Sequence, residues 1–357
     1  MIWIRARRSS DVTYFTRDSG GEIDGLRDGG PGWWLRGAGD TTDPEAVSRV
    51  FTKGPRIEVI GYDIVVAAPR PLSVLLAVDL EQAPHVVRAH RVSVHAALEY
   101  LEDRALVVRR RFGGEDHDDA ARWDQVVGFT HGVNRHAEPH LHDHVLVGSL
   151  PQGSKYALDS RSLYVHARAA DALYRSTLRH EVSTRTTFQP WRSFGGVEQV
   201  EGLDEGYRAL WGGHNEGRGE KYLWHRDEMV ARWSRDSDLL ESRGTVEIPR
   251  HRGPFDEQSF AGALEGLLNV TRRHVVEAWA NATVFGQDPD SLRESIDFMY
   301  PALRDSRGIR ESSIGVGQAR LTPIVRECGP RPLELAELAA WQGRYRDRSR
   351  SIEARSR

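Results

Sequence analysis

The clearest alternation of hydrophobic and polar positions runs through residues 138–147 and predicts a β-strand. Because successive side chains of a strand point to opposite faces, His140, His142 and His144 should project to one side. Apolar side chains occupy the other side: Leu141, Val145 and Val147. The pattern therefore predicts a strand with one histidine-bearing face and one buried face.

The preceding residues 125–131 also have strand composition, and they end at His131. As an antiparallel neighbour, this segment can place the imidazole of His131 beside those of the next strand. Neutral imidazole is the commonest metal ligand, and three protein ligands leave coordination positions open for a substrate. A catalytic metal site and a histidine-rich surface strand without a ligand are both compatible with this spacing.

A β-branched and apolar run at residues 57–68 predicts a buried central strand, which Pro69 and Pro71 end. Asp63 interrupts the run. An ionised carboxylate inside such a strand is costly unless it is paired, so we expect a cation, an imidazole or a hydroxyl group beside it. The alternative is that Asp63 occupies an exposed position of the strand.

Two long segments have helical spacing. The first covers residues 85–112 and ends with three arginines at 109–111. Cationic residues suit the C-terminus of a helix, and a phosphate-contact role for these arginines is an equal alternative. The second helix should begin with Asp159 or Ser160 as its N-cap and extend to about Val182. We expect it to pack across the sheet.

The remaining N-terminal half is less regular. Residues 11–16 have a short strand pattern, and a glycine-punctuated segment contains Trp33 and Trp34. These tryptophans could stack on nucleic-acid bases or fill the edge of a core. Residues 203–235 look mostly helical, with a glycine-rich interruption that starts at Gly212.

Strand alternation stops towards the C-terminus, where short helices are expected at residues 260–268, 270–283, 290–303 and 332–348. We therefore predict an α+β fold, with a central antiparallel sheet flanked by helices and a small helical domain at the C-terminal end. The predicted division is a domain at 1–240, a linker at 241–256 and a helical domain at 257–357.

Composition narrows the possible functions. With 357 residues, of which 39% are hydrophobic, the chain can bury a sizeable core and form two domains. A net charge of −3 argues against a protein that coats DNA regardless of its shape, although a local basic groove is compatible with it. The single Cys328 excludes an intramolecular disulfide and a cysteine-based zinc site, which favours a reducing compartment.

Two further classes are disfavoured. The sequence contains no phosphate-binding GxxxxGK[ST] motif, so we do not expect a P-loop motor. It has no apolar segment near its start and no run approaching the roughly 20 residues that span a bilayer. We therefore expect a cytoplasmic protein without membrane contact.

Several motifs occur in an order that resembles a known family. They are Tyr14 and residues 31–37, 61–64, 67–74, 131–144, 158–164 and 172–175. From about Thr13 to Arg235, the chain resembles the relaxase domain of MobF-class conjugative relaxases, within the endonucleases that bear a His-hydrophobe-His motif. The resemblance implies a central antiparallel sheet flanked by helices.

The resemblance also assigns site residues. It implies that His131, His142 and His144 are metal ligands, which leaves His140 as an accessory residue. It implies that Tyr14 is the nucleophile. Asp63 matches an aspartate near the active site, which either orients a ligand imidazole or receives the phenol proton; we favour the first role.

The implied reaction is transesterification of single-stranded DNA at an origin of transfer. The tyrosine oxygen attacks a phosphodiester and leaves a 5′-phosphotyrosine and a free 3′-hydroxyl. The resemblance favours magnesium or manganese as the divalent metal, whereas three imidazoles also suit zinc, cobalt or nickel. Candidate DNA contacts are Arg70, Arg135, Trp33 and Trp34.

The chain departs from the family pattern in ways that affect its expected partners and nucleophile. Where the family commonly has two pairs of tyrosines, Tyr14 is followed by Phe15, and no other tyrosine precedes Tyr62. Tyr156 and Tyr164 are alternative nucleophiles. The family's usual C-terminal helicase has no counterpart here, so we expect a separate helicase and accessory transfer proteins as partners.

Three other functions share parts of this chemistry. A rolling-circle replication initiator or a transposase would use the same metal and tyrosine. A metal-dependent phosphodiesterase would use metal-bound water in place of Tyr14. A non-catalytic remnant would bind DNA without cutting it.

Overall fold

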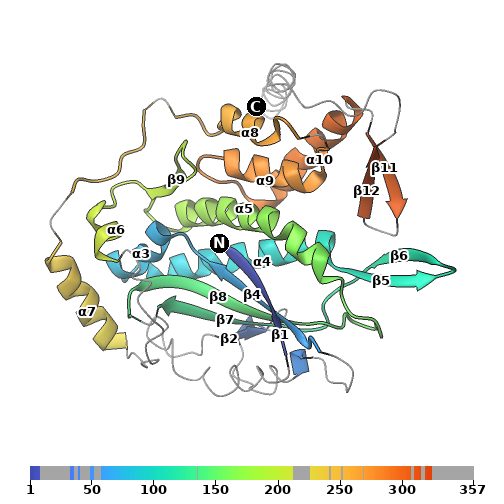
Figure 1. The fold of residues 1–357 in the computed structure, drawn as a ribbon. Coiled ribbons are helices and arrows are strands. Elements are labelled where there is room, and N and C mark those ends of the chain that lie inside the picture. Colours follow the sequence, from blue (N-terminus) through green and yellow to red (C-terminus); the bar gives the residue numbers. More distant parts are fainter. Residues whose placement is uncertain are drawn as a thin grey trace.

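The computed structural model describes residues 1–8, 33–35, 39–40, 49–51, 58–134, 136–211, 226–240, 243–250, 252–267, 269–306, 309–314 and 318–323. The fold is α+β, as predicted: an antiparallel sheet is covered by helices (Figure 1). None of the described helices is both long enough and apolar enough to cross a membrane.

The main sheet has six strands in the order β1-β4-β8-β7-β2-β3, and all neighbours are antiparallel. Their bounds are Ile2–Arg7 (β1), Trp33–Leu35 (β2), Gly39–Asp40 (β3), Gly61–Ala67 (β4), Val126–Val133 (β7) and Pro139–Gly148 (β8). The strands predicted near residues 57–68, 125–131 and 138–147 are confirmed as β4, β7 and β8. The neighbouring strands β4 and β8 are therefore far apart in sequence, whereas the two central strands, β7 and β8, are consecutive.

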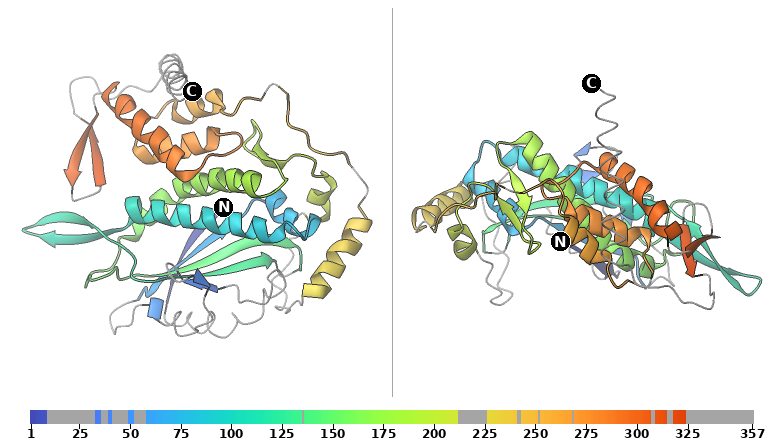
Figure 2. Two further views of the ribbon diagram at one scale, coloured as in Figure 1. Left: turned by 180° about the vertical axis from the view of Figure 1, so that it is seen from behind. Right: turned by 90° about the horizontal axis from the view of Figure 1, so that it is seen from above.

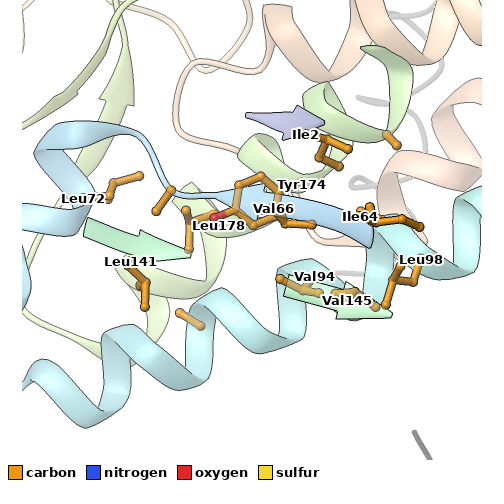
Figure 3. Packing of buried hydrophobic residues seen from close by; sticks show 14 of the residues in the cluster. Ile2, Ile64, Val66, Leu72, Val94, Leu98, Leu141, Val145, Tyr174 and Leu178 are labelled. Atoms are coloured by element: carbon orange, nitrogen blue, oxygen red, sulfur yellow. The ribbon is translucent and has the colours of Figure 1, made fainter. Parts of the chain in front are cut away.

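Helices α3 (Arg70–Val78), α4 (Ala83–Ala105) and α5 (Ser160–Arg185) cover one face of the sheet. Figure 3 shows the core between these layers, where strand residues such as Ile64 and Val145 meet side chains of α4 and α5. Asp159 caps α5 as predicted, because its carboxylate accepts a hydrogen bond from the Arg161 amide at 3.0 Å.

One helix prediction is wrong at its end. The helix predicted over residues 85–112 stops at Ala105, and the chain continues as β5 (Val107–Phe112) and β6 (Glu115–Ala120) in a projecting hairpin (Figures 1 and 2). The turn is made by Gly113 and Gly114, which both have positive φ, as a tight hairpin turn requires.

The three arginines at 109–111 therefore lie on a strand and not at a helix C-terminus. Arg109 contacts Asp118 across the hairpin at 2.9 Å, and Arg110 pairs with Asp119. The acidic β6 strand thus offsets the charge of Arg109 and Arg110, and the interpretation of the three arginines as the C-terminus of a helix is wrong.

A second group of helices follows α6 (Gly206–Leu210) and α7 (Arg226–Asp238): α8 (Glu257–Leu264), α9 (Arg272–Ala282) and α10 (Pro289–Ser306). Helices α8 to α10 stack on α5, on the side away from the sheet (Figures 1 and 2). Their core includes Phe260, Trp279 and, from α5, Ala169 and Leu173.

Two short hairpins complete the described structure: β9 (Pro190–Arg192) with β10 (Glu198–Val200), and β11 (Ile309–Ile314) with β12 (Gln318–Pro323). The second of these lies in the C-terminal part, where the sequence pattern indicated helices alone. The helix predicted at residues 332–348 lies outside the described residues.

Candidate metal centre

Three histidines converge at the centre of the sheet. His131 of β7 lies directly opposite His142 of β8, and His144 follows two positions along β8. One ring nitrogen from each histidine lies within 4.8 Å of the corresponding nitrogens of the other two. All three side chains are half-buried. The structure thus brings together the residues that the sequence suggested as metal ligands, on what we call the histidine face of the sheet.

The histidine face is opposite the helices. Leu141 and Val145, which alternate with the histidines along β8, are fully buried in the core beneath α4 and α5 (Figure 3). This alternation follows from the strand period of two. The predicted division of β8 into one histidine-bearing face and one buried face is therefore confirmed.

The orientation of His142 is set by its own strand. Its Nδ1 lies 2.9 Å from the backbone carbonyl oxygen of His140. Since a carbonyl can only accept, Nδ1 must carry the proton, which leaves the Nε2 lone pair of His142 for a cation. His140 is not part of the convergent set, although its ring centroid is 4.7 Å from that of His142.

Asp63 fixes the orientation of His144. Nδ1 of His144 lies 2.9 and 3.1 Å from the two carboxylate oxygens of Asp63 on the neighbouring strand β4. Asp63 is completely buried, and Arg7 of β1 donates a hydrogen bond to it from its guanidinium. The expected imidazole partner of Asp63 is therefore present, and the alternative of an exposed position is wrong.

The ionisation of these groups follows from burial and neighbours. Burial alone would raise the pKa of Asp63, but the hydrogen bond and charge of His144, followed by those of Arg7, lower that pKa below its ordinary value. Burial, followed by the neighbouring imidazoles of His131, His140 and His144, holds the pKa of His142 well below its ordinary value. Asp63 is thus an anion and His142 is neutral at pH 7, which suits a cation site.

Arg70 takes part in a contact that the sequence did not suggest. Its guanidinium donates to Glu138 at 2.7 Å and to the Pro139 carbonyl at 3.1 Å. The side chain of Asn134 donates to the same Glu138 carboxylate at 2.7 Å. Arg70 therefore holds the start of β8 against helix α3, and its expected DNA contact stays a prediction.

The remaining predicted site residues are placed only in part. Tyr14 and Arg135 lie outside the described residues. The backbones of Trp33 and Trp34 form β2, where Trp33 pairs with Phe129 of β7. Tyr164, an alternative nucleophile, belongs to α5 and so lies on the opposite side of the sheet from the histidines.

A buried polar chain behind the histidine face was missed from the sequence. Asp143 lies between His142 and His144 but points to the helices, where its carboxylate is 3.0 Å from Nε2 of His90. Nδ1 of His90 is 2.7 Å from the Tyr174 hydroxyl, and all three side chains are fully buried. The alternation of β8 was the available signal, because it places Asp143 with Leu141 on the buried face.

Comparison with known proteins identifies the class. Residues 31–212, just over half of the chain, match the family model of the TrwC relaxase. The chain belongs to the TrwC relaxase family, and it is therefore a relaxase, a DNA-nicking enzyme. The matched range includes Asp63 and the three convergent histidines.

Solved structures show the same fold. The conjugative relaxase TrwC in complex with oriT DNA, in a metal-bound structure, has a TM-score of 0.54 at 19% identity and covers 67% of this chain and 98% of its own. A copper-bound structure of the same complex gives the same values. TrwC with a 27-mer DNA comprising the recognition hairpin and the cleavage site has a TM-score of 0.53 at 19% identity, with the same coverage. A search of curated protein sequences found no match.

Proposed function

We propose that the protein nicks single-stranded DNA at an origin of transfer by tyrosine transesterification, during conjugative transfer or mobilisation. Tyr14 would lose its phenol proton and attack the phosphodiester, forming a bond to the 5′ phosphate, while the bond from phosphorus to the 3′ oxygen breaks and that oxygen takes up a proton to become a free 3′-hydroxyl. The observation that carries this proposal is the convergence of three histidine nitrogens within 4.8 Å, in a chain of the relaxase family. We also propose a cytoplasmic location, because the proposed substrate is DNA.

The histidine triad fits a divalent metal ion. His142 and His144 each commit Nδ1 to a protein acceptor, so that Nε2 is the nitrogen left for the ion. Neutral imidazoles leave the full charge of the ion available, and a bound ion would act as a Lewis acid that offsets charge on the scissile phosphate. Magnesium or manganese is our first choice, and zinc, cobalt and nickel are alternatives suited to imidazole.

Asp63 is proposed to position His144, and not to accept the phenol proton. Its carboxylate is already engaged by His144 and Arg7, and its lowered pKa makes it a weak base. As an acceptor, it holds the protonated Nδ1 of His144 in place and directs Nε2 towards the other two histidines.

DNA contacts and partners complete the proposal. Arg70, Arg135, Trp33 and Trp34 are the proposed contacts to the single strand, and a separate helicase with accessory transfer proteins would supply unwinding. We also keep the division into a relaxase domain (1–240), a linker (241–256) and a helical domain (257–357) as part of this proposal.

The proposal is tested with a denaturing gel. The protein is mixed with labelled single-stranded segments of the DNA that flanks its own gene, with Mn²⁺ or with EDTA. We expect a covalent protein–DNA adduct that needs the metal and is lost in Tyr14→Phe, while this variant still binds DNA. Free cleaved ends without an adduct would indicate attack by water, and an adduct in Tyr14→Phe would place the nucleophile elsewhere.

A further inference from the structure

Strand β1 presents a second set of side chains on the histidine face. Ile2 and Ile4 point into the core beneath the helices, so Trp3 and Arg5 point to the other side. Arg7, which belongs to the same alternate set, confirms this assignment, because its guanidinium reaches Asp63, the partner of His144. Trp3 and Arg5 therefore share a face with the candidate metal ligands.

The strand register places these residues close to the histidines. Trp3 pairs with Val65 of β4, and Val65 pairs with His144 of β8, so the three form one row across the sheet. Neighbouring strands are about 4.8 Å apart, which separates the backbones of Trp3 and His144 by roughly 10 Å. Arg5 pairs with Asp63 in the next row.

Both side chains are available to a ligand. Trp3 is 44% exposed, whereas Ile2, on the opposite face of the same strand, is 8% exposed. Arg5 is exposed and has no ion-pair partner among the described residues, whereas Arg7 pairs with Asp63 and Arg8 pairs with Glu58. The edge of the metal centre thus offers one aromatic face and one cation that pairs with no acidic group in the described part of the chain.

We propose that Trp3 and Arg5 form a subsite for the single-stranded DNA next to the bond that is cut. Trp3 stacks on a base, and Arg5 binds the backbone phosphate of a neighbouring nucleotide. An aromatic platform beside a cation is the combination that single strands require, because every base has a stacking face and every linkage carries a negative charge. The inference rests on the proposed function, since it takes the DNA strand to cross the histidine face.

Charge and position favour DNA over a protein at this face. An apolar protein surface would leave the unpaired cation of Arg5 without a partner, which is costly on burial. The subsite is also continuous with the candidate metal centre through Val65 and Asp63. The other described aromatic side chains that are at least as exposed as Trp3 lie outside the six-stranded sheet: Phe112 on the β5–β6 hairpin, Tyr156 before α5, Tyr164 on α5 and Phe194 after β9.

The test measures binding of labelled single-stranded DNA by fluorescence anisotropy, in EDTA so that no strand is cut. Trp3→Ala should weaken binding about 5- to 100-fold, as expected for one lost base stack, and Trp3→Phe should restore most of it. Arg5→Gln should reduce the salt dependence, the slope of log affinity against log salt, by about 0.7. Phe194→Ala and Arg293→Gln are matched controls that remove an exposed aromatic group and an exposed charge elsewhere, and they should bind as the wild type does.

A second arm identifies the stacked base. Abasic sites are placed one at a time along the oligonucleotide; one position should weaken binding to the wild type but not to Trp3→Ala. If the wild type binds DNA and both Trp3→Ala and Arg5→Gln bind equally well, the subsite is wrong and the proposed function stands. A changed oligomeric state in Trp3→Ala, with unchanged DNA affinity, would show a protein contact and overturn the subsite. A wild type without affinity for single-stranded DNA overturns both.

Discussion

The carboxylate of Asp63 accepts a hydrogen bond from Nδ1 of His144 at 2.9 Å, from the adjacent strand of the sheet. The two residues are 81 positions apart in sequence, and only the pairing of β4 with β8 brings them together. This contact links the one buried carboxylate of a hydrophobic strand to a candidate metal ligand. It fixes both the tautomer and the direction of the imidazole.

Asp63→Asn should weaken the binding of Mn²⁺ about 10- to 100-fold, as is typical for the loss of a group that orients a metal ligand. The amide lacks the negative charge that both His144 and Arg7 contact. Isothermal titration calorimetry of the intact chain measures this affinity. Asp118→Asn, in the distant β5–β6 hairpin, is the matched control and should bind Mn²⁺ as the wild type does. Equal affinities in the two variants would contradict the orienting role.

Two neighbouring histidines should respond differently to truncation. His142→Ala removes a nitrogen of the convergent set, so Mn²⁺ affinity should fall by roughly 100-fold or more, and nicking should stop. His140→Ala should keep most of the metal affinity, because His140 contributes its backbone carbonyl to His142 and not its ring nitrogen. Metal titration and the nicking gel check both variants. A comparable loss in His140→Ala would make it a ligand.

The free energy of unfolding of the protein should depend on pH through His166 of helix α5. Burial, followed by the charges of Arg273 and Arg104, lowers the pKa of His166 to about 4. Because this pKa is below the unfolded value, the contribution of His166 to stability is complete above pH 6.5 and is lost as the pH falls to about 4. Its size is about 3 kcal/mol at most.

Urea unfolding of the wild type and of His166→Gln between pH 7 and pH 4.5 measures this effect. As the pH falls, the free energy of unfolding of the wild type should decrease relative to that of His166→Gln, because only the wild type has an imidazole to protonate at this position. Val165→Ala, which changes an exposed side chain beside His166 and removes no titratable group, should show a constant difference from the wild type. If the free energies of unfolding of the wild type and of His166→Gln change with pH in parallel, His166 is not the source of the pH dependence.

The buried chain of Asp143, His90 and Tyr174 should be strongly coupled. His90→Leu leaves the Asp143 carboxylate buried without this partner, and should lower the free energy of unfolding by about 3–5 kcal/mol. In the double variant with Asp143→Leu, part of that loss should be recovered, since neither polar group is left unpaired. Denaturant unfolding of the four proteins gives the coupling energy, and a value near zero would mean that the contact contributes nothing.

The sequence predicted the elements with strong local signals. The period of two in β8 correctly separated the histidines from Leu141 and Val145, and the capping residue Asp159 marked the start of α5. Local signals were insufficient where the chain changes structure without a break. The helical spacing of apolar residues in α4 does not predict that the helix ends at Ala105. In the sequence, the adjacent glycines 113 and 114 were the indication of a hairpin turn.

Contacts between distant strands could not be predicted in the same way. Arg7 is one of many arginines in the sequence, and its link to Asp63 depends on the pairing of β1 with β4. Asp143 had a clearer signal, because alternation puts it on the buried face, but its partner His90 belongs to a helix whose orientation follows from packing. The convergence of the histidines was predictable only because β7 and β8 are consecutive neighbours.

Helix α5 has apolar residues on two sides: Tyr174 and Leu178 contact the sheet layer, whereas Ala169 and Leu173 contact α8 to α10. A shortened recombinant chain that stops at residue 240 would expose to solvent the side of α5 that carries Ala169 and Leu173. We expect such a fragment to aggregate or to be recovered with a chaperone, whereas a fragment that retains α8 to α10 should stay monodisperse in size-exclusion chromatography. Anyone who trims this nicking enzyme for use as a tool should therefore cut after the third of these helices and not at the apparent linker.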